Sequence, residues 1–264
     1  MVSFTLKQFS ITIYMLLMAG VMYMFPHPLV PLVFGILPLI LWGVMRYSFY
    51  VVIGFVVFSF FRIHEVFPII EPLKLPLMLA LASLFVIFMR YVFTNDLQPY
   101  WCKQFTYLML FFILVTVAIP LSSNVGVATS SWTNVYSKII LMTFVIAWMM
   151  REESHFVSTC RIFILVGACV GLVAMFNKAN GIGLVEGSRV TIGRDIGSLL
   201  GDPNDLALVL LYPMAYCIAS FLESQLSKFE RLFSLSVFII LFLALIATQS
   251  RGGILGFLAV VALF

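Results

Sequence analysis

Charged residues are scarce in this sequence. Only 10% of its 264 residues are Asp, Glu, Lys or Arg, whereas soluble domains carry about 25%. Hydrophobic residues make up 63% of the chain, including 27 Phe and 14 Met, and the mean hydropathy is +1.14. This composition excludes an ordinary soluble domain and predicts an integral membrane protein that is solvated mainly by lipid.

The sequence also lacks the patterns that accompany several kinds of chemistry. Its net charge is only +4, and the positive residues are scattered, which argues against nucleic acid as a partner. It has no HExxH, P-loop, nucleophile elbow or carboxylate dyad, so we expect no metal and no cofactor. The cysteines lie far apart without a CxxC pattern, which favours packing over disulfide or metal chemistry. They are Cys102, Cys160, Cys169 and Cys217.

Long apolar runs recur along the whole chain. A bilayer-spanning helix needs about 17 to 25 apolar residues, and backbone groups in lipid must be paired within the segment, so the spans are helices. The predicted spans are 10–25, 29–45, 47–62, 74–93, 104–120, 136–150, 159–176, 205–222 and 232–249, with a tenth beginning at Gly252. We therefore expect an all-α, polytopic membrane protein with about nine or ten transmembrane helices in a single membrane domain, 1–264. Pro38 and Pro213 predict kinks inside two of the spans.

The two ends of the chain carry further signals. Residues 1–25 lack a small-residue cleavage site, so we interpret them as a retained first helix rather than a signal peptide. The tenth span stops at Phe264 without a charged flank. This predicts that the chain is a C-terminally truncated fragment of a longer protein. Lys and Arg are slightly more frequent on the N-terminal side of the membrane, and this predicts a cytoplasmic N-terminus.

One connection differs from the rest of the chain. Residues 177–204 form a glycine-rich, flexible loop on the predicted outer face, and they gather Arg189, Arg194 and Asp202 beside an apolar run. In "GDPND", Asp202 precedes a proline and Asp205 follows three residues later, which is typical of a helix N-cap with a capping box. Both aspartates can act purely as caps. The same helix start can also line a site, with Asn204 free to bond a ligand.

Three arginines are the strongest candidates for ligand binding. Arg189 and Arg194 could be solvated loop residues paired with acids such as Glu186 and Asp195, and Arg251 in "QSRGG" could be an interfacial residue that reaches lipid headgroups. Alternatively, these guanidinium groups bind phosphate oxygens in a two-pronged fashion, with Lys178 nearby as a further cation. We expect a lipid-linked phosphate or diphosphate.

Two further features have weaker specificity. Gly252 and Gly256 form a GxxxG pattern, which usually indicates close helix packing. His64, beside Glu65 in "FRIHEVFP", is a candidate base, although a lone histidine carries little specificity.

The arginines and the "DPN" and "SRG" patterns together carry a resemblance. A chain of many spans with "RVTIGRDIGSLLGDPNDLAL", followed by "SRGG" at the start of the next span, resembles the O-antigen ligase and polymerase superfamily. With "FPHP" after the first span, it is most similar to the exosortase-associated O-glycosylation ligases.

The resemblance implies a glycosyltransferase of the bacterial inner membrane. It would transfer a glycan from an undecaprenyl-diphosphate-linked donor to a lipid, protein or glycan acceptor on the periplasmic face. Arg194 and Arg251, with Arg189 as a third, would hold the diphosphate. The general base would be a histidine in a later periplasmic loop, beyond Phe264.

Two other functions stay open at this point. A polymerase of the same fold would join repeat units instead of delivering finished chains. A lipid-linked sugar flippase or an anion transporter would require polar residues in the middle of its spans, and the predicted spans contain almost none.

Overall fold

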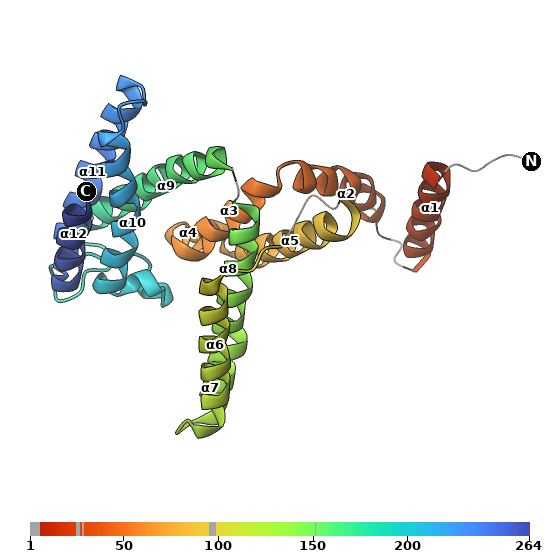
Figure 1. The fold of residues 1–264 in the computed structure, drawn as a ribbon, viewed down its shortest axis with the longest axis horizontal. Coiled ribbons are helices and arrows are strands. Elements are labelled where there is room, and N and C mark those ends of the chain that lie inside the picture. The colour runs from red at the N-terminus through yellow and green to blue at the C-terminus, as the bar shows by residue number, and fades with distance from the viewer. Residues whose placement is uncertain (1–5, 25–26, 28, 95–98, 151) are drawn as a thin grey trace, which may run out of the picture. The chain divides into compact units, whose positions relative to one another are not determined.

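The computed structural model describes residues 6–24, 27, 29–94, 99–150 and 152–264 (Figure 1). Their regular structure is helical, apart from one isolated pairing between Val185 and Arg189. Five of the described helices are long and apolar enough to cross a bilayer, or six if the broken pair Pro31–Arg46 and Ser48–Phe60 counts as one span. The protein is therefore an all-α, polytopic membrane protein.

The chain divides into two compact units, Met1–Ser48 and Phe49–Phe264. The first unit contains α1 (Leu6–Met24) and α2 (Leu29–Arg46). These helices pack through Tyr14, whose hydroxyl donates to the carbonyl of Phe34 and whose ring lies 6.0 Å from the Phe34 ring.

The second unit holds the remaining elements. Its α-helices are α3 (Ser48–Phe60), α4 (Ile63–Val66), α5 (Leu75–Met89), α6 (Lys103–Ala118), α7 (Val125–Ser131), α8 (Ser137–Met149), α9 (Glu153–Asn180), α10 (Pro203–Leu222), α11 (Lys228–Thr248) and α12 (Arg251–Leu263). Short 3-10 or π turns are η1 (Pro68–Leu73), η2 (Arg90–Thr94), η3 (Ile119–Leu121), η4 (Trp132–Tyr136), η5 (Arg194–Ile196) and η6 (Leu199–Gly201).

The predicted spans all coincide with helices, but their lengths differ from the prediction. Long single spans are Leu75–Phe93, Lys103–Leu121, Glu153–Asn180, Pro203–Leu222 and Lys228–Thr248. Three further apolar helices are shorter, with 10–17 residues each: Thr12–Met24, Ser137–Met149 and Arg251–Leu263. The length criterion thus supports five or six spans among the described residues, fewer than the nine or ten that apolar runs alone indicate.

The best-packed part of the second unit is formed by α9, α10, α11 and α12. Leu206, Leu210 and Met214 of α10 are fully buried, as are Leu241 and Ala244 of α11. These side chains belong to one continuous apolar core. The charged loop and the starts of α10 and α12 are therefore attached to the most rigidly packed helices of the chain.

Glycines allow the helices of this bundle to approach closely. A Cβ atom at Gly167 of α9 would lie only 2.4 Å from the Cβ of Pro213, and one at Gly256 of α12 would lie 2.5 Å from a methyl of Leu211. The GxxxG prediction needs one correction, because Gly252 faces open space apart from its neighbour Ser250. Gly253 makes the close contact instead, since helical periodicity turns it toward α10.

The glycine-rich connection is shorter and more ordered than its sequence indicates. Helix α9 continues to Asn180 and ends at Gly181, which adopts the left-handed conformation with φ 68°. The backbone N–H of Val190 donates to the carbonyl of Ala247 in α11 at 3.0 Å, and that of Ile192 donates to Leu200 at 3.0 Å. The segment 190–192 is buried. The expectation of a flexible loop is wrong, because its middle is packed and hydrogen-bonded against the helix ends.

We predict that Gly167→Ala destabilises the bundle. The added methyl would overlap the ring of Pro213, and overpacking of this kind costs about 1–3 kcal/mol of unfolding free energy. The measurement is the midpoint of thermal unfolding of the detergent-purified protein. The matched control is Gly35→Ala in α2, where nothing lies within 4 Å of the added Cβ. Equal midpoints for the two variants would contradict the close crossing.

Candidate functional site

One side-chain oxygen joins three segments of the candidate site. Asn204 Oδ1, in the first turn of α10, accepts a hydrogen bond from Arg189 Nη2 at 3.1 Å and another from Ser250 Oγ at 2.9 Å. Arg189 also donates through Nε to the carbonyl of Thr248 at 3.1 Å. The loop, the start of α10 and the junction between α11 and α12 therefore meet at this residue.

The junction between α11 and α12 is held by its own polar contacts. Ser250 is the N-cap of α12, and its hydroxyl accepts from the backbone N–H of Gly253 at 3.1 Å. Gln249 adopts a left-handed conformation with φ 52°, which is unusual for a residue with a side chain. Its Oε1 accepts from Ser188 Oγ at 3.0 Å. These bonds fix the position at which Arg251 begins α12.

Arg251 itself is exposed at the first residue of α12. Its side chain makes no hydrogen bond or ion pair with any residue that the structure describes. A helix N-terminus carries a partial positive charge and unused backbone N–H groups. Arg251 therefore adds a free guanidinium to an end of a helix that already favours anions.

The start of α10 differs in one respect from the capping-box prediction. Asp202 is the N-cap, and its Oδ1 accepts from the backbone N–H of Asn204 at 2.7 Å. Asp205 makes no reciprocal bond, because the N–H of Asp202 already donates to the carbonyl of Leu199 in η6. Asp205 is exposed on the first turn.

Arg194 lies on the other limb of the loop, at the start of η5. It is flanked by Gly193 and Gly197, both with positive φ of 64° and 70°. The backbone of Arg194 packs closely on Gly201, where an added Cβ would come within 3.0 Å of the Arg194 Cα. The guanidinium is exposed and forms no ion pair with Asp195 or with any other described residue. The backbone is thus fixed while the charge stays free.

Two of the cations in this region, Lys178 and Arg189, have structural partners. Lys178, in the last turn of α9, donates to the carbonyl of Ser188. Arg189 uses two of its nitrogens on protein acceptors, as described above, and does not pair with Glu186 among the described residues. These two cations hold the loop in place, and Arg194 and Arg251 are the ones available to a ligand.

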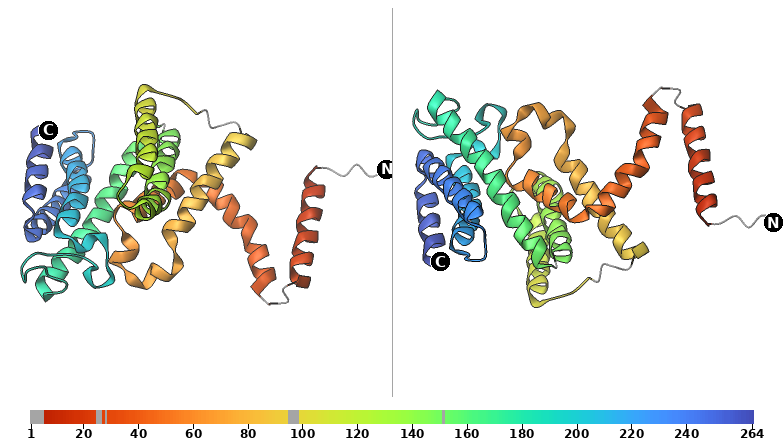
Figure 2. Two further views of the ribbon diagram at one scale, coloured as in Figure 1. Left: turned by 90° about the horizontal axis from the view of Figure 1, so that it is seen from below. Right: turned by 90° about the horizontal axis from the view of Figure 1, so that it is seen from above.

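A polar cluster around Glu65 contacts the loop. No pattern in the sequence predicted this contact. Ser198 Oγ donates to Glu65 Oε2 at 2.5 Å, across 133 positions of the sequence. The other carboxylate oxygen, Oε1, lies 3.1 Å from Arg62 Nη1 and 3.6 Å from His64 Nε2. Figure 2 shows α4, in orange, beside the blue-green loop. The candidate base His64 therefore lies beside Glu65, and Glu65 is the residue that contacts the loop.

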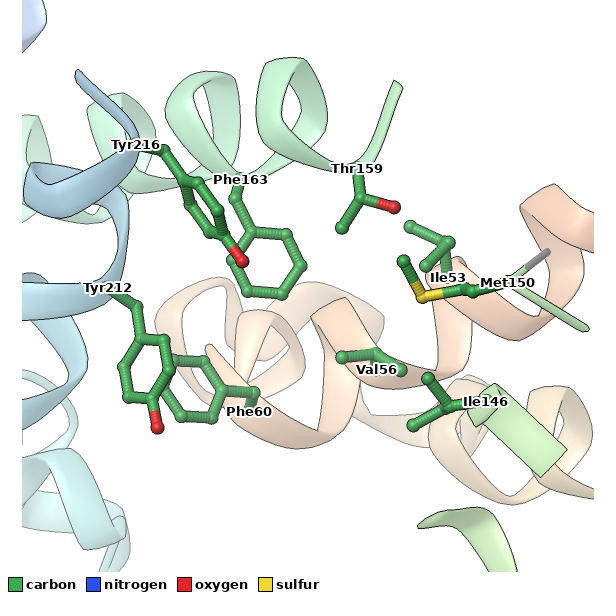
Figure 3. Close-up of a pocket in the computed structure, with 9 residues that line it drawn as sticks. All are labelled: Ile53, Val56, Phe60, Ile146, Met150, Thr159, Phe163, Tyr212 and Tyr216. Atoms are coloured by element: carbon green, nitrogen blue, oxygen red, sulfur yellow. The ribbon is translucent and has the colours of Figure 1, made fainter. Parts of the chain in front are cut away.

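A separate apolar cavity lies beside the second half of α10. Its volume is about 260 Å³, and six of its nine lining residues are apolar. The lining comes from α3, α8, α9 and α10, with the tyrosines on α10 (Figure 3). The residues are Ile53, Val56, Phe60, Ile146, Met150, Thr159, Phe163, Tyr212 and Tyr216. Helix α10 therefore carries the charged cluster at its start and the cavity in its second half.

No family model, no curated protein and no solved structure matches this chain.

We predict that Asn204→Ala loosens the loop without unfolding the bundle. The variant removes the shared acceptor of Arg189 and Ser250, and hydrogen bonds to charged groups contribute about 1.5–3 kcal/mol, less at an exposed position. Hydrogen–deuterium exchange at residues 185–192 should accelerate. The control is Asn180→Ala, whose side chain bonds only the carbonyl of Phe176 in its own helix. Unchanged exchange in Asn204→Ala would show that this joint does not hold the loop.

Proposed function

We propose that this protein transfers a glycan from a polyprenyl-diphosphate-linked donor to an acceptor hydroxyl at a membrane surface, as an O-antigen ligase or an O-glycosylation ligase does. The observation that carries the proposal is the arrangement on α10. A cluster with two uncommitted arginines lies at the start of the helix, and an apolar cavity opens along its second half. A lipid diphosphate has the same arrangement, with a charged head and a hydrocarbon tail.

The charged head is matched by Arg194, Arg251 and two helix N-termini. Guanidinium groups bind phosphate oxygens through paired, charge-assisted hydrogen bonds, and a helix start favours an anion through its dipole and free N–H groups. The first turns of α10 and α12 lie together because Asn204 Oδ1 accepts from Ser250 Oγ. Asp202 and Asp205 lower the net positive charge at the start of α10. We therefore assign phosphate binding to the exposed Arg194 and Arg251.

The hydrocarbon tail is matched by the cavity. Tyr212 lies nine residues beyond Pro203, so a rise of 1.5 Å per residue places it about 14 Å along the helix from the charged end. That depth lies within one leaflet of a hydrocarbon core about 30 Å thick. A single lipid can therefore place its diphosphate at the loop while its tail reaches Tyr212 and Tyr216.

The proposed reaction needs little more than charge stabilisation. A diphosphate is a good leaving group, and fixed cations stabilise the charge that develops on it. The acceptor then has to lose one proton to a nearby base. Because the loop backbone is packed at residues 190–192, the arginines can act from a fixed frame.

The orientation of the protein follows as part of the same proposal. With the N-terminus in the cytoplasm and the nine spans that the apolar runs predict, the loop faces the outside of the membrane, which is the periplasm in a bacterial inner membrane. The resemblance to the O-antigen ligases implies that the lipid-linked donor is on that face. The slight excess of Lys and Arg on the N-terminal side of those nine predicted spans supports this orientation.

We predict that Arg194→Lys and Arg251→Lys each lower glycan transfer about tenfold or more, because lysine keeps the charge but loses the two-pronged geometry. The assay follows a fluorescent glycan on polyprenyl diphosphate into product, with the protein in proteoliposomes. The control is Arg161→Lys, an exposed arginine near the opposite end of α9 that pairs with Glu230 at 2.7 Å.

Wild-type transfer by both loop variants would contradict the proposed role of these arginines. Movement of the labelled lipid across the bilayer without any transfer would favour a flippase instead. A ladder of products of increasing length would identify a polymerase.

A further inference from the structure

The contact between Ser198 and Glu65 places a hydroxyl against a carboxylate next to the arginine loop. Ser198 Oγ donates a short hydrogen bond of 2.5 Å to Glu65 Oε2. Both side chains are partly buried. Glu65 is therefore positioned to accept a hydrogen bond from an alcohol at this place.

The two carboxylate oxygens of Glu65 have different kinds of partner. Arg62 Nη1 lies 3.1 Å from Oε1, and His64 Nε2 lies 3.6 Å from the same oxygen. Oε2 contacts only the serine hydroxyl among the described residues. The ion pair with Arg62 thus holds the carboxylate in one orientation, with Oε2 turned to the loop.

The neighbouring imidazole adds an unused polar atom to the same place. His64 Nδ1 is buried and has no hydrogen-bond partner among the residues that the structure describes. Buried polar atoms are nearly always paired in folded proteins, and an exception calls for an explanation such as a ligand. A second polar group of a bound acceptor would satisfy this nitrogen.

Glu65 is also close to the proposed diphosphate site. A Cβ atom at Gly193 would lie 3.4 Å from the backbone carbonyl oxygen of Glu65 and 2.9 Å from the Cβ of Ser198. Arg194, one of the two arginines available to a ligand, is the next residue in the chain. The backbone of Glu65 therefore lies next to the residue that precedes Arg194.

We propose that Glu65 is the proton acceptor for an incoming alcohol, and that the Ser198 hydroxyl marks the place of that acceptor hydroxyl. This inference rests on the proposed glycan transfer. Glu65 Oε2 takes the proton of the acceptor O–H, and the acceptor oxygen forms a bond to the anomeric carbon of the donor. The bond from that carbon to the diphosphate oxygen breaks, and its electron pair leaves on the diphosphate beside Arg194.

The test compares Glu65→Gln with Ser198→Ala in the full-length protein in proteoliposomes. The donor is the fluorescent polyprenyl-diphosphate glycan, and two alcohols serve as acceptors in separate arms, octyl glucoside for a sugar hydroxyl and N-acetylserine amide for a serine hydroxyl. A positioned general base contributes about 10²- to 10⁴-fold. Glu65→Gln should therefore lower kcat at least about 100-fold and leave the KM for the donor unchanged. Ser198→Ala should lower kcat much less than Glu65→Gln does, because it removes the competing hydroxyl and leaves the carboxylate in place.

A second pair of variants separates a proton acceptor from a structural tie. Glu65→Ala should lose activity and regain part of it when formate is added, since formate supplies the missing carboxylate. Glu65→Asp should retain intermediate activity. A carboxylate that only anchors α4 to the loop would show neither the rescue nor the difference between Gln and Asp.

The outcomes distinguish the two proposals. Wild-type kcat in Glu65→Gln, or equal losses in Glu65→Gln and Ser198→Ala without formate rescue, would overturn the role of Glu65 and leave glycan transfer standing. A wild-type protein that transfers glycan to neither alcohol would overturn both.

Discussion

The arrangement of the site depends on the hydrogen bonds that converge on the amide oxygen of Asn204. This oxygen accepts from Arg189 of the loop and from Ser250, the N-cap of α12. The backbone N–H of Asn204 donates to Asp202, the N-cap of α10. Two segments far apart in sequence, the loop and the junction between α11 and α12, are thereby tied to the first turn of α10. Helix α10 is buried on its other side among α9, α11 and α12. The hydrogen bonds to Asn204 therefore hold the polar loop and the start of α12 against a well-packed helix.

The cations of this surface divide into two groups with different physical roles. Lys178 and Arg189 donate to backbone carbonyls and to Asn204, so their charges are used to hold the loop. Arg194 and Arg251 are exposed. The backbone of Arg194 packs closely on Gly201, and Arg251 begins a capped helix, so both have defined backbone positions. A guanidinium on a fixed backbone needs little reorganisation when an anion arrives, and such preorganisation is what charge stabilisation requires.

The sequence predicted the helical architecture well because lipid allows few alternatives. Apolar runs in such a chain must form helices, and Asp202 before Pro203 has the pattern of a helix start. Fewer helices meet the length criterion than the apolar runs predict, because three of the predicted spans are helices of 10–17 residues. Gly253, rather than Gly252, proved to be the close-packing residue, because the direction in which a glycine faces depends on where the helix begins.

The contacts within the candidate site could be predicted only in part. The arginines and the helix starts were visible as local patterns, but the pairing of Ser198 with Glu65 depends on the tertiary fold. The only local signal was an acid beside His64. Similarly, no local pattern separates Arg189, which is bonded to protein, from Arg194, which is free. The roles of like residues in one loop are set by which backbone carbonyls happen to lie within reach.

The central claim is that the charged cluster and the apolar cavity hold one lipid diphosphate. The most direct measurement uses a polyprenyl diphosphate with a photoreactive group either next to the diphosphate or along the tail, followed by mass spectrometry of the cross-linked peptides. We expect the first probe to label residues 186–204 or the start of α12, and the second to label the segment with Tyr212 and Tyr216. Labelling by both probes at the opposite ends of the helices, around 153–161 and 223–231, would contradict the account.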